Sequence, residues 1–378
     1  MKAAIVYDRV NTWGGAEKVL LVLHEIFPNA PLYTSVYDEK RAPWARVFPQ
    51  VIPSFLQKIP ILKNYHELLG WLTPIAYESF NFDGYDLVVS VTSEAAKGII
   101  TKPTTLHICY CLTPTRYLWS GYEEYLRNPP RRLSWIPFYR YISQPLLKYT
   151  KYWDKIAAQR PDMIIAISTE VRDRIKKYYE RNSEVIYPPV DTKKYEIRDK
   201  RYEKIKPSNN LLPTSYYLIV SRLVPYKKVN LAIDACNELG ETLVIVGIGS
   251  EENKLKSKYK FKKNIVFKGF VSDENLVFLY QGAKAFIHTQ EEDFGITSVE
   301  AQAAGVPVIA FKKGGALDTV IDGKTGIFFE SQTKESLINA IKRFDKLKFN
   351  KDDLIQNAKG FTKERFKNEF LDLLNRKV

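Results

Sequence analysis

Cysteine and histidine are scarce in this sequence, with three and four residues respectively among 378. Three is an odd number, and Cys109 and Cys111 lie two positions apart in an apolar segment, where a disulfide closes with difficulty, so we expect buried thiols. No second pair of cysteines or histidines has the spacing of zinc ligands. The sequence therefore predicts neither a disulfide framework nor a metal site.

Long apolar runs are also missing. No segment approaches the roughly 18 consecutive apolar residues of a membrane-spanning helix. The opening residues MKAAIVYDRV have neither the length nor the flanks of a signal peptide. We therefore expect a cytoplasmic protein.

Acidic residues are outnumbered by basic ones, 43 against 57, which gives a net charge of +14. Such an excess favours anionic partners, although a lysine-rich solvated surface also explains it. Residues 125–155 mix Arg and Lys with aromatic residues and contain almost no acid, which favours peripheral contact with anionic lipid on the cytoplasmic face of a membrane. A helical hairpin packed on the first domain explains this segment equally well. No nucleic-acid motif is present, so neither DNA nor RNA is an expected partner.

Apolar strand-like runs alternate with helical patterns along most of the chain, which is typical of a parallel sheet covered on both faces. The first series of strands is expected at 2–8, 87–92, 106–111, 163–168 and 184–190. A charged, turn-rich segment at 191–215 follows, and the alternation then restarts. Because the chain is too long for one ordinary core, we predict an α/β protein of two doubly wound, Rossmann-like domains that face a cleft.

Ligands of such sheets bind beyond the C-terminal strand ends, so the loops that follow strands are the places to search. SRLVPYKK offers Arg222 and Lys227, a pair of cations that suits a diphosphate, although a solvated basic turn explains them too. VGIGSEE contains Gly247 and Gly249 but lacks the third glycine of the dinucleotide fingerprint, which argues against a nicotinamide or flavin cofactor. Close approach to a ligand and an ordinary tight turn both explain these two glycines.

EEDFGITSVE, residues 291–300, is a third such loop. The preceding apolar run predicts a strand and the following residues predict a helix, so Glu292 lies at the strand end and Glu300 about one and a half turns into the helix. Gly295 permits close backbone approach, and the first N–H groups of the helix form an anion site. Both carboxylates suit sugar hydroxyls. The structural alternative is that Glu300 is an exposed helix residue and that the helix dipole favours Glu292.

A fourth loop, KKGGALDTV, brings Gly314 and Gly315 to the same edge. Four strand-end loops of one domain then offer cations, glycines, a helix N-terminus and paired acceptors. This combination fits a nucleoside diphosphate that carries a sugar.

In this order, the segments SRLVPYK, IVGIGSEENKL, VFKGFVSDENL and EEDFGITSVEAQAAGVPVIAFKKGGALDTV resemble the donor domain of the retaining glycosyltransferases of family 4, which have the GT-B fold. Glu292 and Glu300 match the E-x7-E motif of that family. WGGAEKV resembles its first glycine loop, and FTKERFKNEFLDLL resembles its C-terminal helix, which crosses back to the first domain. The resemblance implies an acceptor domain at 1–195, a donor domain at 196–360 and the returning helix at 361–378.

The resemblance also implies a role for each matching residue. Arg222 and Lys227 would neutralise the diphosphate without a metal, because they supply the positive field at the leaving group. Glu300 would hold the ribose hydroxyls. The residues that would hold the transferred hexose are Glu292 and the backbone of Phe294, Gly295 and Ile296. Arg222, Lys227 and Glu292 are thus the expected catalytic residues.

Two further contacts with the donor are implied. The base would lie near Gly269 and Val271, and Gly14 and Gly15 would bring the loop of the first domain to the phosphates. The nucleotide sugar is the donor substrate, and no other cofactor is expected.

The segment CYCLTPTRYLW departs from the family, which commonly has Tyr-Cys-His-Thr-Pro-x-Arg-Tyr. Leu112 stands where that histidine usually contacts the donor sugar. His107 lies five residues upstream, about 17 Å along a strand, so it cannot substitute. Arg116 and Tyr117 still match, and they are the expected contacts to the acceptor or the donor sugar.

The segments TPTRYLW and SRLVPYKKVNLAIDA most resemble the branch that contains mannosyltransferases of polysaccharide and lipid-linked oligosaccharide assembly. We therefore predict transfer of mannose from GDP-mannose to a saccharide or a lipid-linked acceptor. A UDP-sugar donor is the close alternative. A catalytically silent sugar-nucleotide-binding protein, which Leu112 favours, and a sugar-nucleotide epimerase also stay open. A phosphorylase would need a pyridoxal-binding lysine environment that is not identified.

Overall fold

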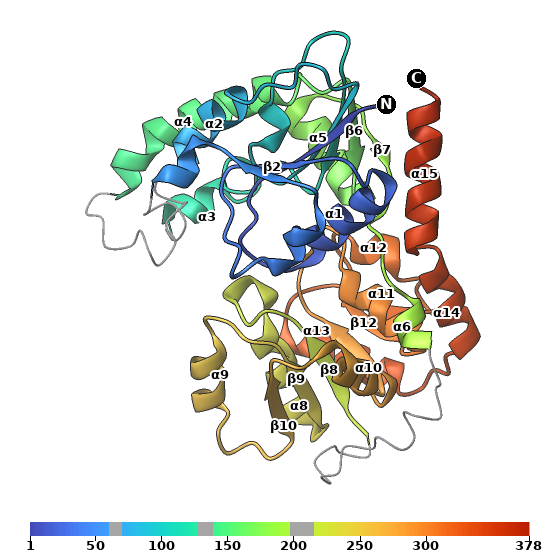
Figure 1. Cartoon of the computed structure of the whole chain (residues 1–378). Coiled ribbons are helices and arrows are strands. Elements are labelled where there is room, and N and C mark those ends of the chain that lie inside the picture. The colour runs from blue at the N-terminus through green and yellow to red at the C-terminus, as the bar shows by residue number, and fades with distance from the viewer. Residues whose placement is uncertain (60–69, 128–138, 197–214, 378) are drawn as a thin grey trace. The chain divides into compact units, whose positions relative to one another are not determined.

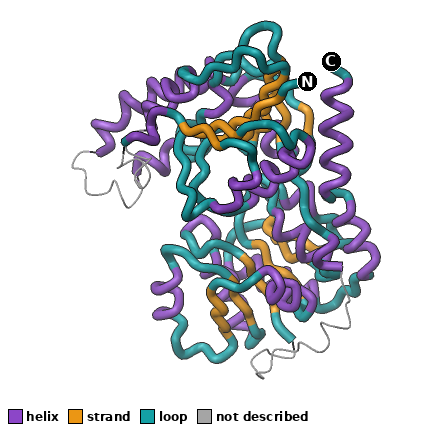
Figure 2. Tube along the Cα trace, in the orientation of Figure 1, coloured by secondary structure: helices purple, strands orange, loops and turns teal. Residues whose placement is uncertain are grey.

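The computed structural model describes residues 1–59, 70–127, 139–196 and 215–377. The chain divides into two compact units (Figure 1), one formed by Met1–Tyr187 together with Lys367–Val378 and the other by Pro188–Phe366. The strands of each unit lie side by side in Figure 2, and every strand pair is parallel within the described ranges.

The described residues of the first unit form a seven-stranded sheet in the order β3-β2-β1-β4-β5-β6-β7. The strands are β1 (Ala3–Tyr7), β2 (Leu32–Thr34), β3 (Val51–Pro53), β4 (Leu87–Thr92), β5 (Leu106–Cys111), β6 (Met163–Ala166) and β7 (Glu184–Val185). This is the doubly wound order, and its switch point lies between β1 and β4. Both of these strands are buried along their whole length, which is why their sequences are largely apolar.

The helices of the first unit cover this sheet. They are α1 (Gly15–Ile26), α2 (Thr73–Glu78), α3 (Tyr122–Arg127), α4 (Tyr139–Ala157), α5 (Thr169–Tyr179) and the later part of α15 (Lys363–Asn375). Ser168 caps the N-terminus of α5, where its hydroxyl oxygen accepts a hydrogen bond from Val171 N at 3.1 Å. The ring of Phe370 in α15 lies 6.3 Å from that of Phe27, so the returning helix packs into the core of this unit.

One predicted strand is shorter than expected. The run 184–190 forms β7 only over Glu184–Val185. Pro188 and Pro189 follow, and proline lacks the N–H that a strand donates to its neighbour. The prolines therefore end the pairing.

The described residues of the second unit form a six-stranded sheet in the order β10-β9-β8-β11-β12-β13. The strands are β8 (Tyr217–Val220), β9 (Leu243–Val246), β10 (Ile265–Gly269), β11 (Ala285–His288), β12 (Val308–Phe311) and β13 (Gly326–Phe329). The helices are α6 (Lys193–Glu196), α8 (Val229–Leu239), α9 (Glu252–Lys258), α10 (Asp273–Gln281), α11 (Ile296–Ala303), α12 (Ala316–Thr319), α13 (Lys334–Phe344) and α14 (Lys351–Lys359). The order is again doubly wound.

Along the chain, the boundary between the units falls between Tyr187 and Pro188, whereas the sequence predicts it after residue 195. Residues 188–195 belong to the second unit because their backbone bonds to it: Val190 N donates to Phe361 O at 2.8 Å, and Gln281 Nε2 donates to Tyr195 O at 3.1 Å. Helix α15 begins in the second unit and belongs to the first from Lys367 on. The expected return of the C-terminal helix to the first domain is thereby confirmed.

Candidate active site

The second sheet has its switch point between β8 and β11, and doubly wound sheets bind ligands beyond the strand ends at such a point. The loop after β8 is SRLVPYKK, and the loop after β11 is TQEEDFG. The structure therefore brings Arg222, Lys227 and Glu292 to one edge of one sheet.

Lys227 and Glu292 form an ion pair between these two loops. Gln290 Nε2 donates to the same carboxylate at 2.8 Å, and Thr289 Oγ1 donates to the Lys227 carbonyl at 2.7 Å. Burial raises the pKa of Glu292, but Lys227 outweighs it and the pKa falls to about 2. Glu292 is therefore ionised at neutral pH, and an ionised carboxylate accepts hydrogen bonds only, which suits sugar hydroxyl donors.

Arg222 is exposed on the same loop, where its Nη2 lies 3.0 Å from the hydroxyl oxygen of Tyr226. Lys227 Nζ lies 5.3 Å from the centre of the Tyr226 ring. Tyr226 thus contacts both cations of the loop. Sequence reasoning missed it, although it stands in the SRLVPYKK segment itself.

Gly295 caps helix α11 with a backbone that L-residues rarely adopt, at φ +90°. An added Cβ would lie 3.2 Å from the ring of His288, the last residue of β11. His288 Nδ1 lies 3.1 Å from Ser298 Oγ, and its Nε2 is buried without a hydrogen-bond partner in the described part of the chain. The helix start at Ile296 is therefore positioned by glycine geometry and by a buried histidine.

The glycines of KKGG also have a structural reason. An added Cβ at Gly314 would lie 2.3 Å from the Glu292 carbonyl, and one at Gly315 would lie 2.2 Å from Phe294 Cα. Gly315 N donates to Glu292 O at 2.8 Å. The loop after β12 therefore packs directly on the loop that bears Glu292, and the Phe294 ring is buried 5.6 Å from that of Phe361.

Glu300 is only 4% exposed, so the structural alternative of an exposed helix residue is wrong. Tyr280 OH donates to Glu300 Oε2 at 3.2 Å. Burial and the Glu300 carboxylate raise the pKa of Tyr280 well above its ordinary value. Glu300 faces α10 because Tyr280 supplies a donor there. Its expected ribose contact stays a prediction.

Gly247 and Gly249 are needed by a neighbouring loop. Added Cβ atoms would lie 1.9 Å from Ser221 O and 2.3 Å from Leu223 O respectively, and Leu223 N donates to Ile248 O at 3.0 Å. These glycines let the loop after β9 support the loop that bears Arg222. Gly269, near the expected base site with Val271, ends β10 in a left-handed conformation at φ +65°.

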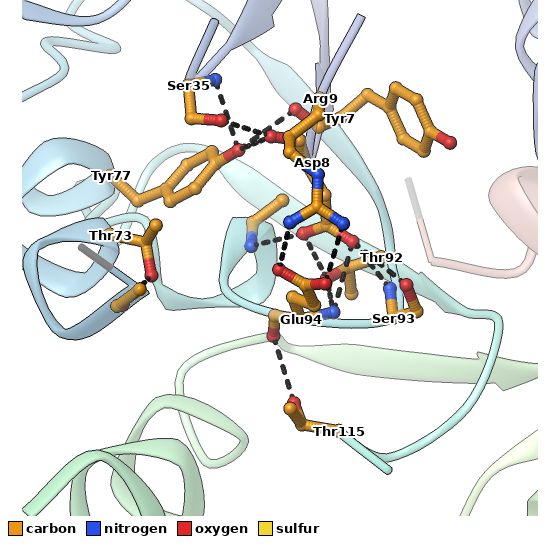
Figure 3. A network of polar contacts seen from close by, with 12 residues as sticks. Tyr7, Asp8, Arg9, Ser35, Thr73, Tyr77, Thr92, Ser93, Glu94 and Thr115 are labelled. Carbon is orange, nitrogen blue, oxygen red and sulfur yellow. Dashed lines mark hydrogen bonds and ion pairs between the residues drawn. The ribbon is translucent and has the colours of Figure 1, made fainter. Parts of the chain in front are cut away.

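The switch point of the first sheet holds a polar network that sequence reasoning missed (Figure 3). Asp8, directly after β1, accepts hydrogen bonds from Thr92 Oγ1 and from the backbone N–H groups of Ser93, Glu94 and Ala96, at 2.7 to 3.0 Å. Burial and Glu94 raise the pKa of Asp8. The carboxylate thus joins the loops after β1 and β4. No local motif marks it, because its partners lie more than 80 positions away.

Arg9 and Glu94 form a two-armed ion pair next to Asp8, with distances of 2.6 and 2.8 Å. Burial and the Glu94 carboxylate raise the pKa of Tyr117 well above its ordinary value. Arg116 and Tyr117, the two predicted contact residues, lie in the loop that follows β5.

The carboxylate of Asp154, in α4, binds the loop that contains Arg116 and Tyr117. Its carboxylate pairs with Lys97 at 2.5 Å and accepts hydrogen bonds from Thr115 Oγ1 at 2.9 Å, Trp119 Nε1 at 2.7 Å and Tyr179 OH at 2.8 Å. Both charged side chains of the pair are almost completely buried. Residues 115 and 119 flank Arg116 and Tyr117, so Asp154 fixes the conformation of the segment that bears them.

Four of the predicted site residues belong to the first unit: Gly14, Gly15, Arg116 and Tyr117. Gly14 is extended at φ −173°, which any residue adopts, and it precedes α1. Their proximity to a donor, and the cleft itself, stay predictions.

His107 is a buried structural residue, as its place along the strand suggests. Its Nε2 lies 2.8 Å from Ser90 Oγ, and burial lowers its pKa to about 3, with Arg160 acting in the same direction. Leu112 follows β5 and is partly exposed.

The stability of both units is expected to fall as the pH drops below about 6.5. Burial lowers the pKa of His288 to about 4 and that of His107 to about 3. Each histidine takes up a proton on unfolding, so its contribution is complete above the unfolded pKa and is lost as the pH falls towards the folded one. The loss amounts to at most about 3 kcal/mol for His288 and somewhat more for His107.

Denaturant unfolding at several pH values between about 7 and 4 measures this effect. We expect His288→Asn to flatten the pH dependence of the second unit and His107→Asn that of the first. Unchanged slopes in both variants would show that other groups cause the acid sensitivity.

Within the described ranges, no three His, Cys, Asp or Glu side chains are grouped to hold a metal ion. The three cysteines are buried with free thiols, as expected. No helix in the described part of the chain combines the length and the hydropathy that crossing a bilayer requires.

Comparison with known proteins gives a family match for the second half. Residues 201–361 match the family model described as glycosyl transferases group 1. The uncharacterized glycosyltransferase MJ1178 of Methanocaldococcus jannaschii is 26% identical over 57% of this chain and 58% of its own. The GDP-mannose-dependent alpha-(1-6)-phosphatidylinositol monomannoside mannosyltransferase of Mycolicibacterium smegmatis is 27% identical over 48% of this chain and 52% of its own. The chain thus spans little more than half the length of these relatives.

The fold is similar over the whole chain to that of a solved structure. The crystal structure of Anabaena HepE in complex with UDP matches with a TM-score of 0.68 and 20% identity, and the match covers 100% of both chains. The predicted fold class is thereby confirmed. With its two doubly wound units, this chain has the GT-B fold, and its residues 201–361 match the glycosyl transferases group 1 model.

Proposed function

We propose that this chain is a retaining, metal-independent glycosyltransferase of family 4 that moves a hexose from a nucleoside diphosphate sugar to a saccharide or a lipid-linked acceptor. The observation that carries this proposal is the Lys227–Glu292 ion pair at the switch point of the second unit, beside the helix start at Gly295. A cation, an ionised carboxylate and a helix N-terminus suit a diphosphate attached to a hydroxyl-rich sugar. The family match over residues 201–361 supports it.

The chemistry assigned to the site is departure of a nucleoside diphosphate. As the bond between the sugar C1 and the phosphate oxygen breaks, negative charge grows on the diphosphate, and Arg222 and Lys227 stabilise it together with the N–H groups at the start of α11. The acceptor oxygen forms the new bond to C1 from the same face, and its proton passes to the leaving phosphate oxygen. No protein nucleophile is needed in this route. Glu292 accepts hydrogen bonds from the sugar hydroxyls.

Mannose from GDP-mannose is the proposed donor, and the GDP-mannose-dependent relative supports this choice. A UDP-sugar is the alternative, which the UDP complex of the similar fold favours. A silent sugar-nucleotide-binding protein is the remaining alternative with an observation in its favour, since Leu112 stands in place of the family histidine. Residues 1–195 would bind the acceptor and residues 196–360 the donor.

Calorimetric titration with GDP and with UDP, without added metal, separates the donors. Tighter binding of GDP supports GDP-mannose, tighter binding of UDP keeps the site but overturns the mannose assignment, and binding of neither contradicts the site. Incubation with the donor alone and with a lipid-linked acceptor then separates the activities. A transferase gives product only with acceptor, an epimerase converts the donor alone, and a silent binder does neither.

Replacement of Glu300 by alanine is expected to weaken binding of the preferred nucleotide about 10- to 100-fold, because hydrogen bonds to a charged group contribute about 1.5–3 kcal/mol. Calorimetry measures the dissociation constant directly. The predicted contact is to the ribose hydroxyls, so binding of inorganic diphosphate should change little.

Tyr280→Phe is the matched control for this variant. It removes the hydroxyl that donates to Glu300 but leaves the carboxylate in place. If Tyr280→Phe weakens the nucleotide as much as Glu300→Ala does, the effect arises from local packing and the ribose contact is wrong.

A further inference from the structure

Helix α4 presents an aromatic face to solvent. Tyr141 and Tyr152 are 74% and 71% exposed, and Tyr149 and Ile156 are also exposed. Large apolar and aromatic side chains are normally exposed singly, whereas a group on one element marks an interaction surface. Figure 1 shows α4 along the outside of the first unit.

The exposed residues lie on one side of the helix. Positions 141, 145, 149, 152 and 156 recur at intervals of three and four, which places them on one helical face. The inward face is separate: Leu147 packs with Leu118 and Leu126, and Trp153 packs with Tyr77. The inward side chains fill the core on this side of the helix, so the outward tyrosines are not part of it.

The charges of α4 are basic on this outward side. Lys148 and Lys155 are exposed beside the tyrosines. Lys155 pairs with Glu180 at the end of α5, and no described acid pairs with Lys148. The single acid of the helix, Asp154, is buried against Lys97. The outward face thus combines apolar rings, polar phenol tips and positive charge.

We infer that the outward face of α4 (Tyr141, Pro145, Lys148, Tyr149, Tyr152, Lys155 and Ile156) binds an anionic lipid surface, with the helix parallel to the membrane plane. Tyrosine rings suit the boundary between head groups and acyl chains, because the ring is apolar and the hydroxyl stays hydrated. Lysines beside them meet lipid phosphates. A protein partner would need acidic side chains placed opposite these lysines. The phosphates of an anionic lipid surface supply negative charge at every position along the helix.

This inference goes beyond the proposed function and does not depend on it, since lipid binding needs no donor and no turnover. Sedimentation of the full chain with phosphatidylcholine vesicles and with vesicles that also contain phosphatidylglycerol tests it. We expect binding to the anionic vesicles alone, with loss at high salt, which screens the lysine–phosphate attraction. Equal binding to both kinds of vesicle, or to neither, would overturn the inference.

Variants then locate the surface. Tyr141→Ser with Tyr152→Ser is expected to lower the partition coefficient at least about fivefold, through lost ring burial. Lys148→Ala is expected to lower it about fivefold, because one lysine near an anionic surface contributes about this factor. All these residues are exposed, so circular dichroism and melting temperature should not change.

Matched controls lie on the second unit, in the basic segment KYKFKKN. Phe261 is 86% exposed and is flanked by lysines, so Phe261→Ser and Lys260→Ala remove the same kinds of group elsewhere. We expect no more than a small change from either control. Equal losses from both sets would show non-specific charge binding and overturn the assignment to α4. Self-association that the tyrosine variant abolishes without any lipid dependence would overturn it in favour of a second copy.

Discussion

Replacement of both Arg222 and Lys227 by alanine is expected to lower kcat/KM for the donor about 100- to 10,000-fold. Each contact between a fixed cation and a phosphate contributes about 1.5–3 kcal/mol, and two are lost together. The loss should fall on kcat more than on KM, because charge on the diphosphate grows as the glycosidic bond breaks. Steady-state kinetics with purified donor and acceptor measure both parameters.

The double variant Lys254→Ala with Lys256→Ala is its control. Both lysines lie on α9 in the same unit, are exposed, and pair only with neighbouring glutamates of the segment 251–252 among the described contacts. The control removes the same formal charge without touching the switch point. Unchanged turnover in the Arg222 and Lys227 variant would eliminate the diphosphate assignment.

Loss of Lys97 is the second change with a large expected effect, here on stability. Lys97→Met leaves Asp154 buried without its cation, and such a loss typically costs about 3–5 kcal/mol. Asp154 also accepts from Thr115, Trp119 and Tyr179, which places the cost near the lower end of that range. Guanidinium unfolding with a probe in the first unit, such as Trp119 fluorescence, measures it.

Lys155→Met tests the same helix at an exposed pair. Lys155 and Glu180 also form an ion pair at 2.7 Å, but both side chains face solvent. Exposed pairs contribute little to stability, so this variant should unfold close to the parent chain. If the two variants unfold alike, burial does not strengthen the Lys97–Asp154 pair and the positioning of the Thr115–Trp119 segment needs another cause.

The sheet positions could be predicted because buried parallel strands leave a strong signal. The runs around Ile5 and Val89 are largely apolar, and the structure buries both in the centre of the first sheet. The loops after β8 and β11 could be found for the same reason, since each follows such a run. Strand ends were less predictable where proline intervened, as at Pro188.

Side-chain partners far apart in the sequence could not be predicted. Asp8 gives no local signal, because its donors at Thr92, Ser93 and Ala96 become neighbours only when β1 and β4 pair. Gly249 is a second case. A glycine after a strand suits a ligand or a tight turn, and only the structure shows that the backbone of Leu223 requires it here. Local spacing identifies loops, but the packing of loops on one another decides what their residues do.

Helix α15 has a consequence for how the chain is made. Lys367 pairs with Glu25 at 2.6 Å, and Arg376 pairs with Glu184 at 2.8 Å, so the first unit is closed by residues that the ribosome adds after the whole of the second unit. Domains usually fold in the order of their synthesis. Here the surface of the first unit that binds α15, around Phe27, stays uncovered while residues 188–366 are synthesised and fold. The second unit therefore completes its own core first. The first unit, although most of it is synthesised earlier, is completed last.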